Sequence, residues 1–210
     1  MKARRLRVLA AAGAASVAVL AGAVPAQAAG TFKCTATGAK IGATSVAVAN
    51  PLYSPCLKQR VAQPIDFALP ANPLLGLTVE SVYGRTVPNA RVNAQAYAGA
   101  VIVNIALLGF DVRLEVVESS STVSCSGGKP HLFNRGGVTD LHINGVQVID
   151  FENDPRSFSI PGLGSLAINQ TTKTANEITF TAFKLTPAAI FPAITLADTK
   201  AGFAGNPCTA

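Results

Sequence analysis

The sequence has little charge and few of the side chains that most often carry chemistry. Of its 210 residues, 13% are charged, and there are no Trp, three Tyr, one Met and two His. With 49% hydrophobic residues, the chain is too apolar to remain disordered, so we expect a folded protein. The lack of Trp argues against a flat surface for crystalline polysaccharide, since such surfaces stack sugars on exposed aromatic rings. An end-on sugar site stays open.

The first 28 residues have the layout of a secretory signal peptide. Residues 1–7 are basic, residues 8–24 form an uncharged Ala-rich run, and Ala26-Gln27-Ala28 places small residues at both recognition positions of a signal peptidase site. The run is shorter and less hydrophobic than the about 20 apolar residues of a stable membrane helix. We therefore expect cleavage after Ala28 rather than a retained membrane anchor.

Most of the net charge lies in this leader. Removing residues 1–28 takes away four of the 17 basic residues and none of the 11 acidic ones, which reduces the formal charge from +6 to +2. Without a Lys/Arg cluster or interleaved aromatic platform, we expect no nucleic-acid binding, and no membrane contact after cleavage. Residues 29–210 are long enough to bury about 70% of their extended-chain surface, so we predict one domain there.

All four cysteines, Cys34, Cys56, Cys125 and Cys208, follow the expected cleavage site. An even number in an exported chain indicates two disulfides, for which three pairings are possible. We favour Cys34 with Cys56, which closes a short loop, and Cys125 with Cys208, which ties the C-terminus to the main sheet. The wide Cys spacings and the lack of a His at a zinc-finger interval argue against zinc, so we expect no metal and no cofactor.

Period-two alternation recurs from Thr31 onward, and no helical period extends over eleven residues. We therefore predict an all-β fold, an antiparallel β-sandwich of about ten strands, with a barrel or a solenoid as alternatives. The expected strands are 32–40, 45–49, 77–83, 90–107, 110–116, 141–143, 146–148, 158–160, 166–168, 178–183 and 194–201.

Two local signals are the clearest. Val101-Ile102-Val103 is apolar on both sides, which predicts a central strand covered on both faces. Asn144-Gly145 lies between two alternating segments and suits the positive φ angles of a type I′ hairpin. The Pro- and Gly-rich stretches 50–55, 69–76 and 186–192 are typical of loops.

The second half of the chain contains several motifs in a recognisable order. They are Ser124-Cys125-Ser126-Gly127-Gly128, the hairpin 141–148, Ile160-Pro161-Gly162-Leu163-Gly164, the strand 165–169 and the near-terminal Cys208. From Ser119 to Cys208 this order resembles the exported actinobacterial proteins called the choice-of-anchor P family. The resemblance implies export and implies no particular activity. Because residues 206–210 show no sorting motif or hydrophobic tail, we expect a secreted protein, extracellular or loosely associated with the cell wall.

Candidate catalytic groups are sparse. The G-x-S-x-G motif of a nucleophile elbow is absent. His131 and His142 are the two imidazoles, and the alternation around His142 predicts a surface position. Cys125 precedes His131 by six residues, but we expect it in a disulfide. We therefore assign no catalytic residue.

One carboxylate cluster stands out, Asp150, Glu152 and Asp154, whose spacing puts three side chains on one face of an extended segment. Hard oxygen ligands of this kind suit calcium. A solvated turn before Pro155 is the favoured interpretation, because no EF-hand glycine and no Glu at the twelfth position follow.

These observations favour a secreted, non-catalytic binding or cell-surface structural module. Its expected partner is an extracellular protein or a cell-wall component, and an exposed apolar surface would be the place to look for it. The alternative is a secreted hydrolase with an unrecognised site. A deep polar pocket holding His131 or His142 beside Ser and Asp would favour the hydrolase.

Overall fold

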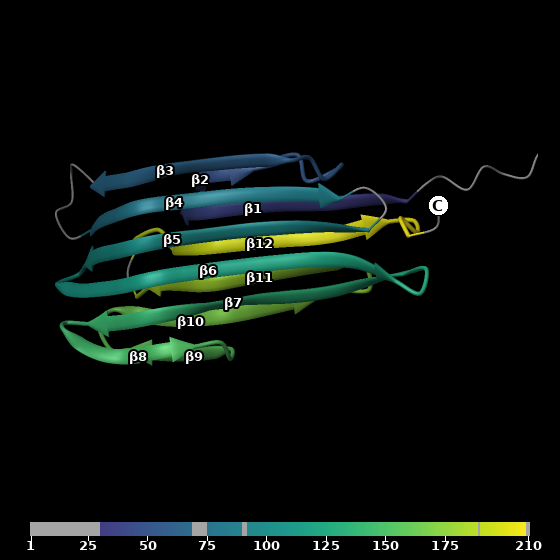
Figure 1. Ribbon diagram of the computed structural model, residues 1–210. Coiled ribbons are helices and arrows are strands. Elements are labelled where there is room, and N and C mark those ends of the chain that lie inside the picture. The colour runs from purple at the N-terminus through teal and green to yellow at the C-terminus, as the bar shows by residue number, and fades with distance from the viewer. Residues whose placement is uncertain (1–29, 69–74, 90–91, 189, 209–210) are drawn as a thin grey trace, which may run out of the picture.

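The computed structural model describes residues 30–68, 75–89, 92–188 and 190–208, which form twelve β-strands and no helix (Figure 1). The expected signal peptide, residues 1–28, and most of the expected loop 69–76 lie outside the described residues. Within those ranges, no helix long and apolar enough to cross a membrane is found.

The strands form two six-stranded antiparallel sheets. One sheet has the order β2 (Thr44–Ala49), β1 (Thr31–Ile41), β12 (Ile194–Ala204), β11 (Glu177–Pro187), β10 (Gly164–Lys173) and β9 (Arg156–Ile160). The other is a meander of β3 (Gln59–Ala68), β4 (Leu75–Asn89), β5 (Asn93–Leu107), β6 (Phe110–Ser126), β7 (Lys129–Ile143) and β8 (Val146–Glu152). We call them the β1 sheet and the β6 sheet.

The two sheets lie face to face, with β6 over β11 and β5 over β12 (Figure 1). The apolar core fills the space between them, and its largest fully buried side chains come from both sheets, among them Leu77, Ile105, Leu141, Leu166 and Phe183. The sheets are not closed into a barrel. The predicted all-β antiparallel sandwich is confirmed.

The sequence prediction of about ten strands missed β3 entirely. This strand lies at the edge of the β6 sheet, and most of its described side chains are exposed, so its sequence lacks a clear apolar alternation. It also contains Pro64, at a point where the register with β4 shifts between Gln63 and Ile65. Proline is tolerated at such an edge bulge, because no ladder hydrogen bond is lost there.

In each long strand, the alternation of core-facing and outward-facing side chains shifts by one residue at one position. In β5, Ala94 to Ala100 face the core at even-numbered positions, whereas Val103, Ile105 and Leu107 face it at odd-numbered positions. Between them, Ile102 has a φ of 50° and is 47% exposed. Neighbouring strands shift at aligned positions, as at Val79/Val82, Leu114/Val117 and Val138/Leu141.

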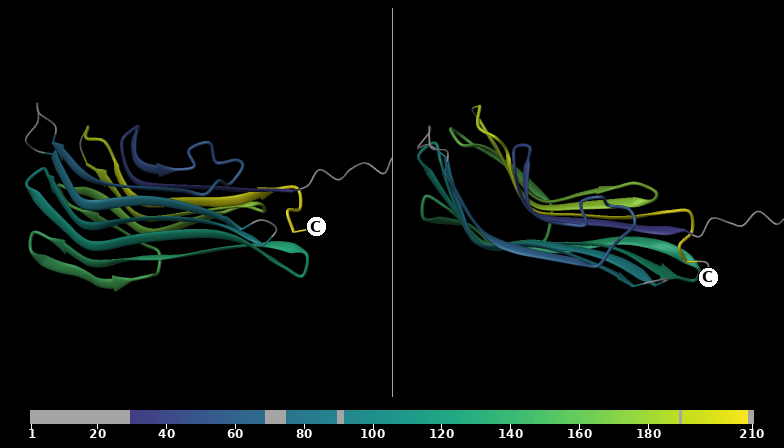
Figure 2. Two further views of the ribbon diagram at one scale, coloured as in Figure 1. Left: turned by 45° about the horizontal axis from the view of Figure 1, so that its top comes forward. Right: turned by 90° about the horizontal axis from the view of Figure 1, so that it is seen from above.

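The same shift crosses the β1 sheet, where Ala47, Asn169 and Ala197 have positive φ within strands. Figure 2 shows that both sheets bend together partway along their strands. This bend corrects the prediction that β5 is covered on both faces. The two-sided apolarity of Val101-Ile102-Val103 marks the phase change, and no other sheet of the described residues covers the outer face of β5.

Both disulfides have the favoured pairing, and they act at different places. Cys34 of β1 is bonded to Cys56 in the loop before β3. Cys125, near the end of β6, is bonded to Cys208 after β12, so this bond links the two sheets. Two disulfides indicate an oxidising environment of the kind found outside the cell. The predicted hairpin is also present, with Asn144 and Gly145 at φ 52° and 77° between β7 and β8.

Candidate functional site

A groove of about 750 Å³ lies on the outer face of the β6 sheet. We call it the β6 groove, because outward residues of β6 from Val116 to Thr122 lie along it. It begins beside the bend and extends toward the Cys125 end of the strand. The residues that line it are Tyr83, Gln95, Tyr97, Val116, Glu118, Ser119, Ser120, Thr122, Phe133, Asn134, Arg135, Gly136, Gly137, Thr139, Phe151, Asn153 and Phe180.

The antiparallel register explains why these side chains share one face. Residues directly opposite each other on neighbouring strands project to the same side of a sheet. Three such rows cross β4, β5, β6 and β7, and nine of their twelve residues line the groove, whereas Gly99, Arg85 and Val87 do not. The rows are Tyr83–Gly99–Glu118–Gly137, Arg85–Tyr97–Ser120–Arg135 and Val87–Gln95–Thr122–Phe133.

Two glycines let larger groups lie close to the sheet. A Cβ atom added to Gly99 would lie 2.6 Å from three atoms of the Tyr83 phenol, so the ring occupies the space above this glycine. A Cβ atom added to Gly137 would lie 2.7 Å from Oδ1 of Asn153. Any larger residue at either position would displace these neighbours and change the shape of the groove.

Aromatic rings stand on both sides of β6. Tyr83 and Tyr97 are partly buried on the β4 and β5 side. Phe133 on β7 and Phe151 on β8 are 48% and 62% exposed on the other side. Exposed rings of this size are costly in water, and their gathering in one groove is typical of a contact surface.

Hydrogen bonds hold the two tyrosines. The Tyr83 hydroxyl donates to Oε1 of Glu118 at 3.2 Å, and the Tyr97 hydroxyl donates to Oε1 of Gln95 at 2.5 Å. Partial burial and the Glu118 carboxylate together raise the pKa of Tyr83 to about 12, so its phenol remains a protonated donor at neutral pH. Arg135 and Glu118 are the charged residues of the described lining, and their formal charges cancel.

The residues that the sequence analysis considered for catalysis lie elsewhere. His131 and His142 are both on β7, and neither lines the groove. His142 Nε2 lies 3.4 Å from Oδ1 of Asp140. Cys125 carries no free thiol, since it is disulfide-bonded. The structure therefore does not bring an imidazole to the serines of the groove.

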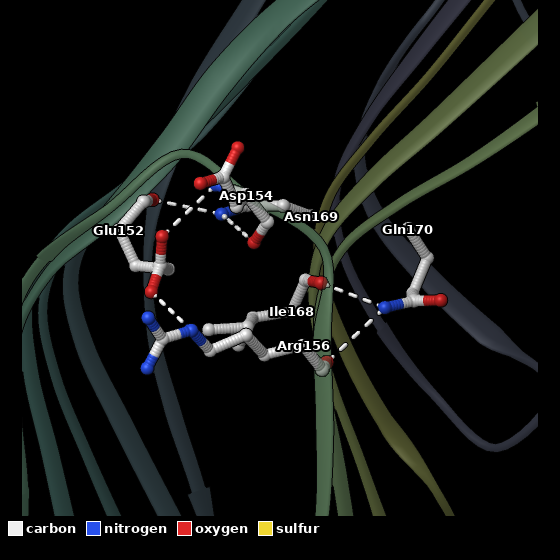
Figure 3. A network of polar contacts seen from close by, with 6 residues as sticks. All are labelled: Glu152, Asp154, Arg156, Ile168, Asn169 and Gln170. Carbon is white, nitrogen blue, oxygen red and sulfur yellow. Dashed lines mark hydrogen bonds and ion pairs between the residues drawn. The ribbon is translucent and has the colours of Figure 1, made fainter.

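The expected carboxylate cluster forms a structural contact at the edge of the sandwich (Figure 3). Glu152 is 8% exposed, and one of its carboxylate oxygens lies 2.5 Å from Nε of Arg156. The other accepts a hydrogen bond from the backbone N–H of Asp154 at 3.0 Å. Asn169 on β10 donates its amide to the backbone oxygens of Glu152 and Asp154 at 2.7 and 3.2 Å. These contacts hold the crossing from β8 to β9.

This arrangement does not favour the calcium hypothesis. Both carboxylate oxygens of Glu152 already face donors, while Asp150 and Asp154 are exposed. The part of the chain that the structure describes contains no cluster of three or more His, Cys, Asp or Glu side chains that could hold a metal ion.

A second polar cluster connects the loop after β2 to strands β11 and β12 of the β1 sheet. The Tyr53 hydroxyl donates to Oε1 of Glu177 at 2.9 Å, and Lys200 Nζ lies 3.0 Å from the other carboxylate oxygen. The same ammonium lies 4.5 Å from the centroid of the Tyr53 ring. The hydrogen bond from Lys200 lowers the pKa of Glu177, whereas burial and the Glu177 carboxylate raise the pKa of Tyr53. Together with the nearby disulfide, this cluster has a structural role.

On the outer face of the same sheet, Asp198 accepts a hydrogen bond from the Thr181 hydroxyl at 2.6 Å. Burial raises the pKa of Asp198, although this hydrogen bond and the charges of Lys40 and Lys200 act in the opposite direction. The carboxylate is therefore less stable here than in water.

Sequence reasoning missed most of the β6 groove. The prediction began the β7 strand at Leu141, so the outward series Phe133, Arg135 and Gly137 was not recognised. Residues 131–139 show no alternation of polar and apolar types, because Leu132 is followed by apolar Phe133 and two adjacent glycines come after Arg135. The packing of Tyr83 over Gly99 had no signal in the sequence, because 16 residues separate them.

Comparisons with known protein families, with curated proteins and with solved structures found no match to this chain. The resemblance to the choice-of-anchor P family therefore stays a prediction, and the groove has to be interpreted from its own chemistry.

Proposed function

We propose that this protein is secreted and acts as a non-catalytic binding module whose ligand occupies the β6 groove. The observation that carries this proposal is the gathering of four aromatic side chains of the β6 sheet, Tyr83, Tyr97, Phe133 and Phe151, around one groove on its outer face. The fifth aromatic residue of the lining, Phe180, belongs to the β1 sheet and is 2% exposed. Grooves that combine apolar rings with a few polar groups are the usual form of binding sites. The disulfides and the signal-peptide pattern of residues 1–28 support a place outside the cell.

The chemistry of the lining favours binding over hydrolysis. A glycosidase of the common kind needs two carboxyl groups across the scissile bond, and an acyl-transfer enzyme needs a base beside its nucleophile. Among the described lining residues, Glu118 is the one carboxylate, and Tyr83 donates a hydrogen bond to it. No histidine lies among them.

Sedimentation with insoluble cell-wall fractions tests the proposal, together with pull-down of proteins from the culture medium. The full chain is expressed with export and recovered from the medium, where its N-terminal sequence should begin at Ala29. We expect retention by a wall fraction or by one defined secreted protein. Arg135→Ala in the groove should weaken retention, whereas Lys184→Ala, an exposed cation on the β1 sheet, should not. Absence of retention in every fraction would contradict the proposal.

A further inference from the structure

The lining of the β6 groove combines rings with uncharged hydrogen-bonding groups. Tyr97 and Phe133 present ring surface from opposite sides of β6. Between and beside them lie hydroxyl and amide side chains, which donate and accept hydrogen bonds without carrying a charge: Gln95, Ser120, Thr139 and Asn153. A sugar ring has the complementary pattern, with C–H groups on its faces and hydroxyl groups around its edge.

We propose that the ligand of the β6 groove is a neutral glycan chain. This inference rests on the proposed binding function and names the class of its ligand. The rings would stack on sugar faces, and the amides and hydroxyls would bind the sugar hydroxyl groups. Arg135 adds a charged donor and Glu118 a charged acceptor to this set. Hydrogen bonds between such charged groups and sugar hydroxyls are shorter and stronger than those of neutral groups.

The charge of the groove argues against ionic ligands. A nucleic acid or a phosphate-rich polymer is held mainly by several Lys and Arg contacts, each neutralising a phosphate. The described lining contains one Arg and one Glu, so its formal charge is zero, and Arg85, opposite Tyr97 on β4, adds a single cation beside it. A strongly anionic chain would meet Glu118 without enough cations to offset it.

The position of the groove also argues against a peptide added as an extra strand. That mode requires a free sheet edge that offers unpaired backbone groups. The groove follows β6, which is paired with β5 on one side and β7 on the other, and the sheet edges are β3 and β8. The floor therefore offers side chains and not a backbone ladder to its ligand.

The dimensions favour a chain over a single sugar. Six residue steps separate Val116 from Thr122, which corresponds to about 20 Å at the rise of a β-strand. Such a length accommodates several consecutive sugar rings. The four aromatic side chains that the β6 sheet contributes are spread along it rather than gathered at one end, with Phe151 opposite Thr139 beside the bend and Phe133 opposite Thr122.

Affinity electrophoresis in native gels tests the inference. The probes are soluble neutral polysaccharides, namely a β-glucan, a galactomannan, glycogen and the neutral polysaccharide extracted from the producing cell's wall, with polygalacturonate as the anionic comparison. We expect at least one neutral probe to retard the full exported protein more than polygalacturonate does. Tyr97→Ala and Phe133→Ala should each weaken this affinity about tenfold, since each removes a stacking ring.

Matched variants separate binding from folding. Tyr97→Phe keeps the ring and should keep most of the affinity, and Leu52→Ala removes an 80% exposed apolar side chain outside the groove and should change nothing. If no neutral probe retards a protein that still sediments with walls or a secreted partner, the glycan assignment is wrong and the binding function stands. If groove variants bind like the wild type, the assignment of the site is wrong. If the wild-type protein is retained by no polysaccharide, no wall fraction and no secreted protein, both proposals fail.

Discussion

The bend in the sandwich can be tested by placing asparagine at two adjacent positions of β5. If the alternation of Ala94 to Ala100 continued unchanged, Ile102 would face the core and Val103 would face solvent. The structure has the opposite arrangement, with Ile102 47% exposed and Val103 fully buried. Ile102→Asn and Val103→Asn therefore distinguish a bent strand from a regular one.

The expected magnitudes differ clearly. Val103→Asn removes a buried valine, worth about 1.5–2 kcal/mol, and buries an amide without partners at a further cost of about 1–3 kcal/mol. Ile102→Asn loses about 1 kcal/mol of half-buried apolar contact. It gains a comparable amount, about 1 kcal/mol, because asparagine tolerates the positive φ of this position far better than a β-branched side chain. We expect the free energy of unfolding to fall by about 3–5 kcal/mol at 103 and to change by less than about 1 kcal/mol at 102.

Urea unfolding at pH 7, followed by far-UV circular dichroism with the disulfides intact, measures both changes. The dependence of unfolding free energy on urea concentration should stay the same in the two variants, so that the midpoints can be compared directly. A tolerated Val103→Asn together with a strongly destabilising Ile102→Asn would refute the phase change.

Three further predictions concern the disulfides and the charges of the β1 sheet. Replacing Cys125 and Cys208 together with alanine opens a loop with a sequence separation of 83 and should lower the unfolding free energy by about 4.5 kcal/mol, measured by urea titration; an unchanged midpoint would contradict it. Asp198→Asn should raise Tm at pH 7 and lose this advantage at pH 3, where the wild-type carboxyl is protonated in both states, because the raised pKa of Asp198 makes its ionisation unfavourable in the folded state. Glu177 has a lowered pKa, so its carboxylate stabilises the folded state above its ordinary pKa of 4.5, and this stabilisation is lost as the pH falls below that value. The Tm difference between wild type and Glu177→Gln should therefore shrink between pH 5 and pH 2. A constant difference would argue against the contact with Lys200.

Local patterns in the sequence predicted those parts of the structure whose cause is local. Asn144-Gly145 predicted its hairpin, because both residues accept the positive φ values of the turn. The four cysteines predicted two cross-links, and the favoured pairing, with Cys34–Cys56 closing a short loop and Cys125–Cys208 tying the C-terminus to the main sheet, is the one that the structure contains. The edge strand β3 was missed for an equally physical reason: its exposed side chains are under little pressure to alternate, and Pro64 lies at its bulge.

The bend and the groove could not be predicted in the same way. Val101-Ile102-Val103 indicated correctly that both sides of β5 carry apolar residues, but not that the inward phase changes there. That change depends on matching shifts in the neighbouring strands, such as those at Val79/Val82 and Leu114/Val117. The sequence of β5 taken alone therefore does not predict a bend at that point.

The sequence by itself determined the all-β class, the disulfides and the expectation of export, since each follows from composition or from residues close together in the chain. The tertiary structure decided where function can lie. Tyr83, Tyr97, Glu118 and Phe133 come from four strands and share a groove because the register places them on one face. The sequence contains few charged residues, and the lining of the β6 groove has the same character. It has aromatic rings on both sides of β6, one cation and one carboxylate.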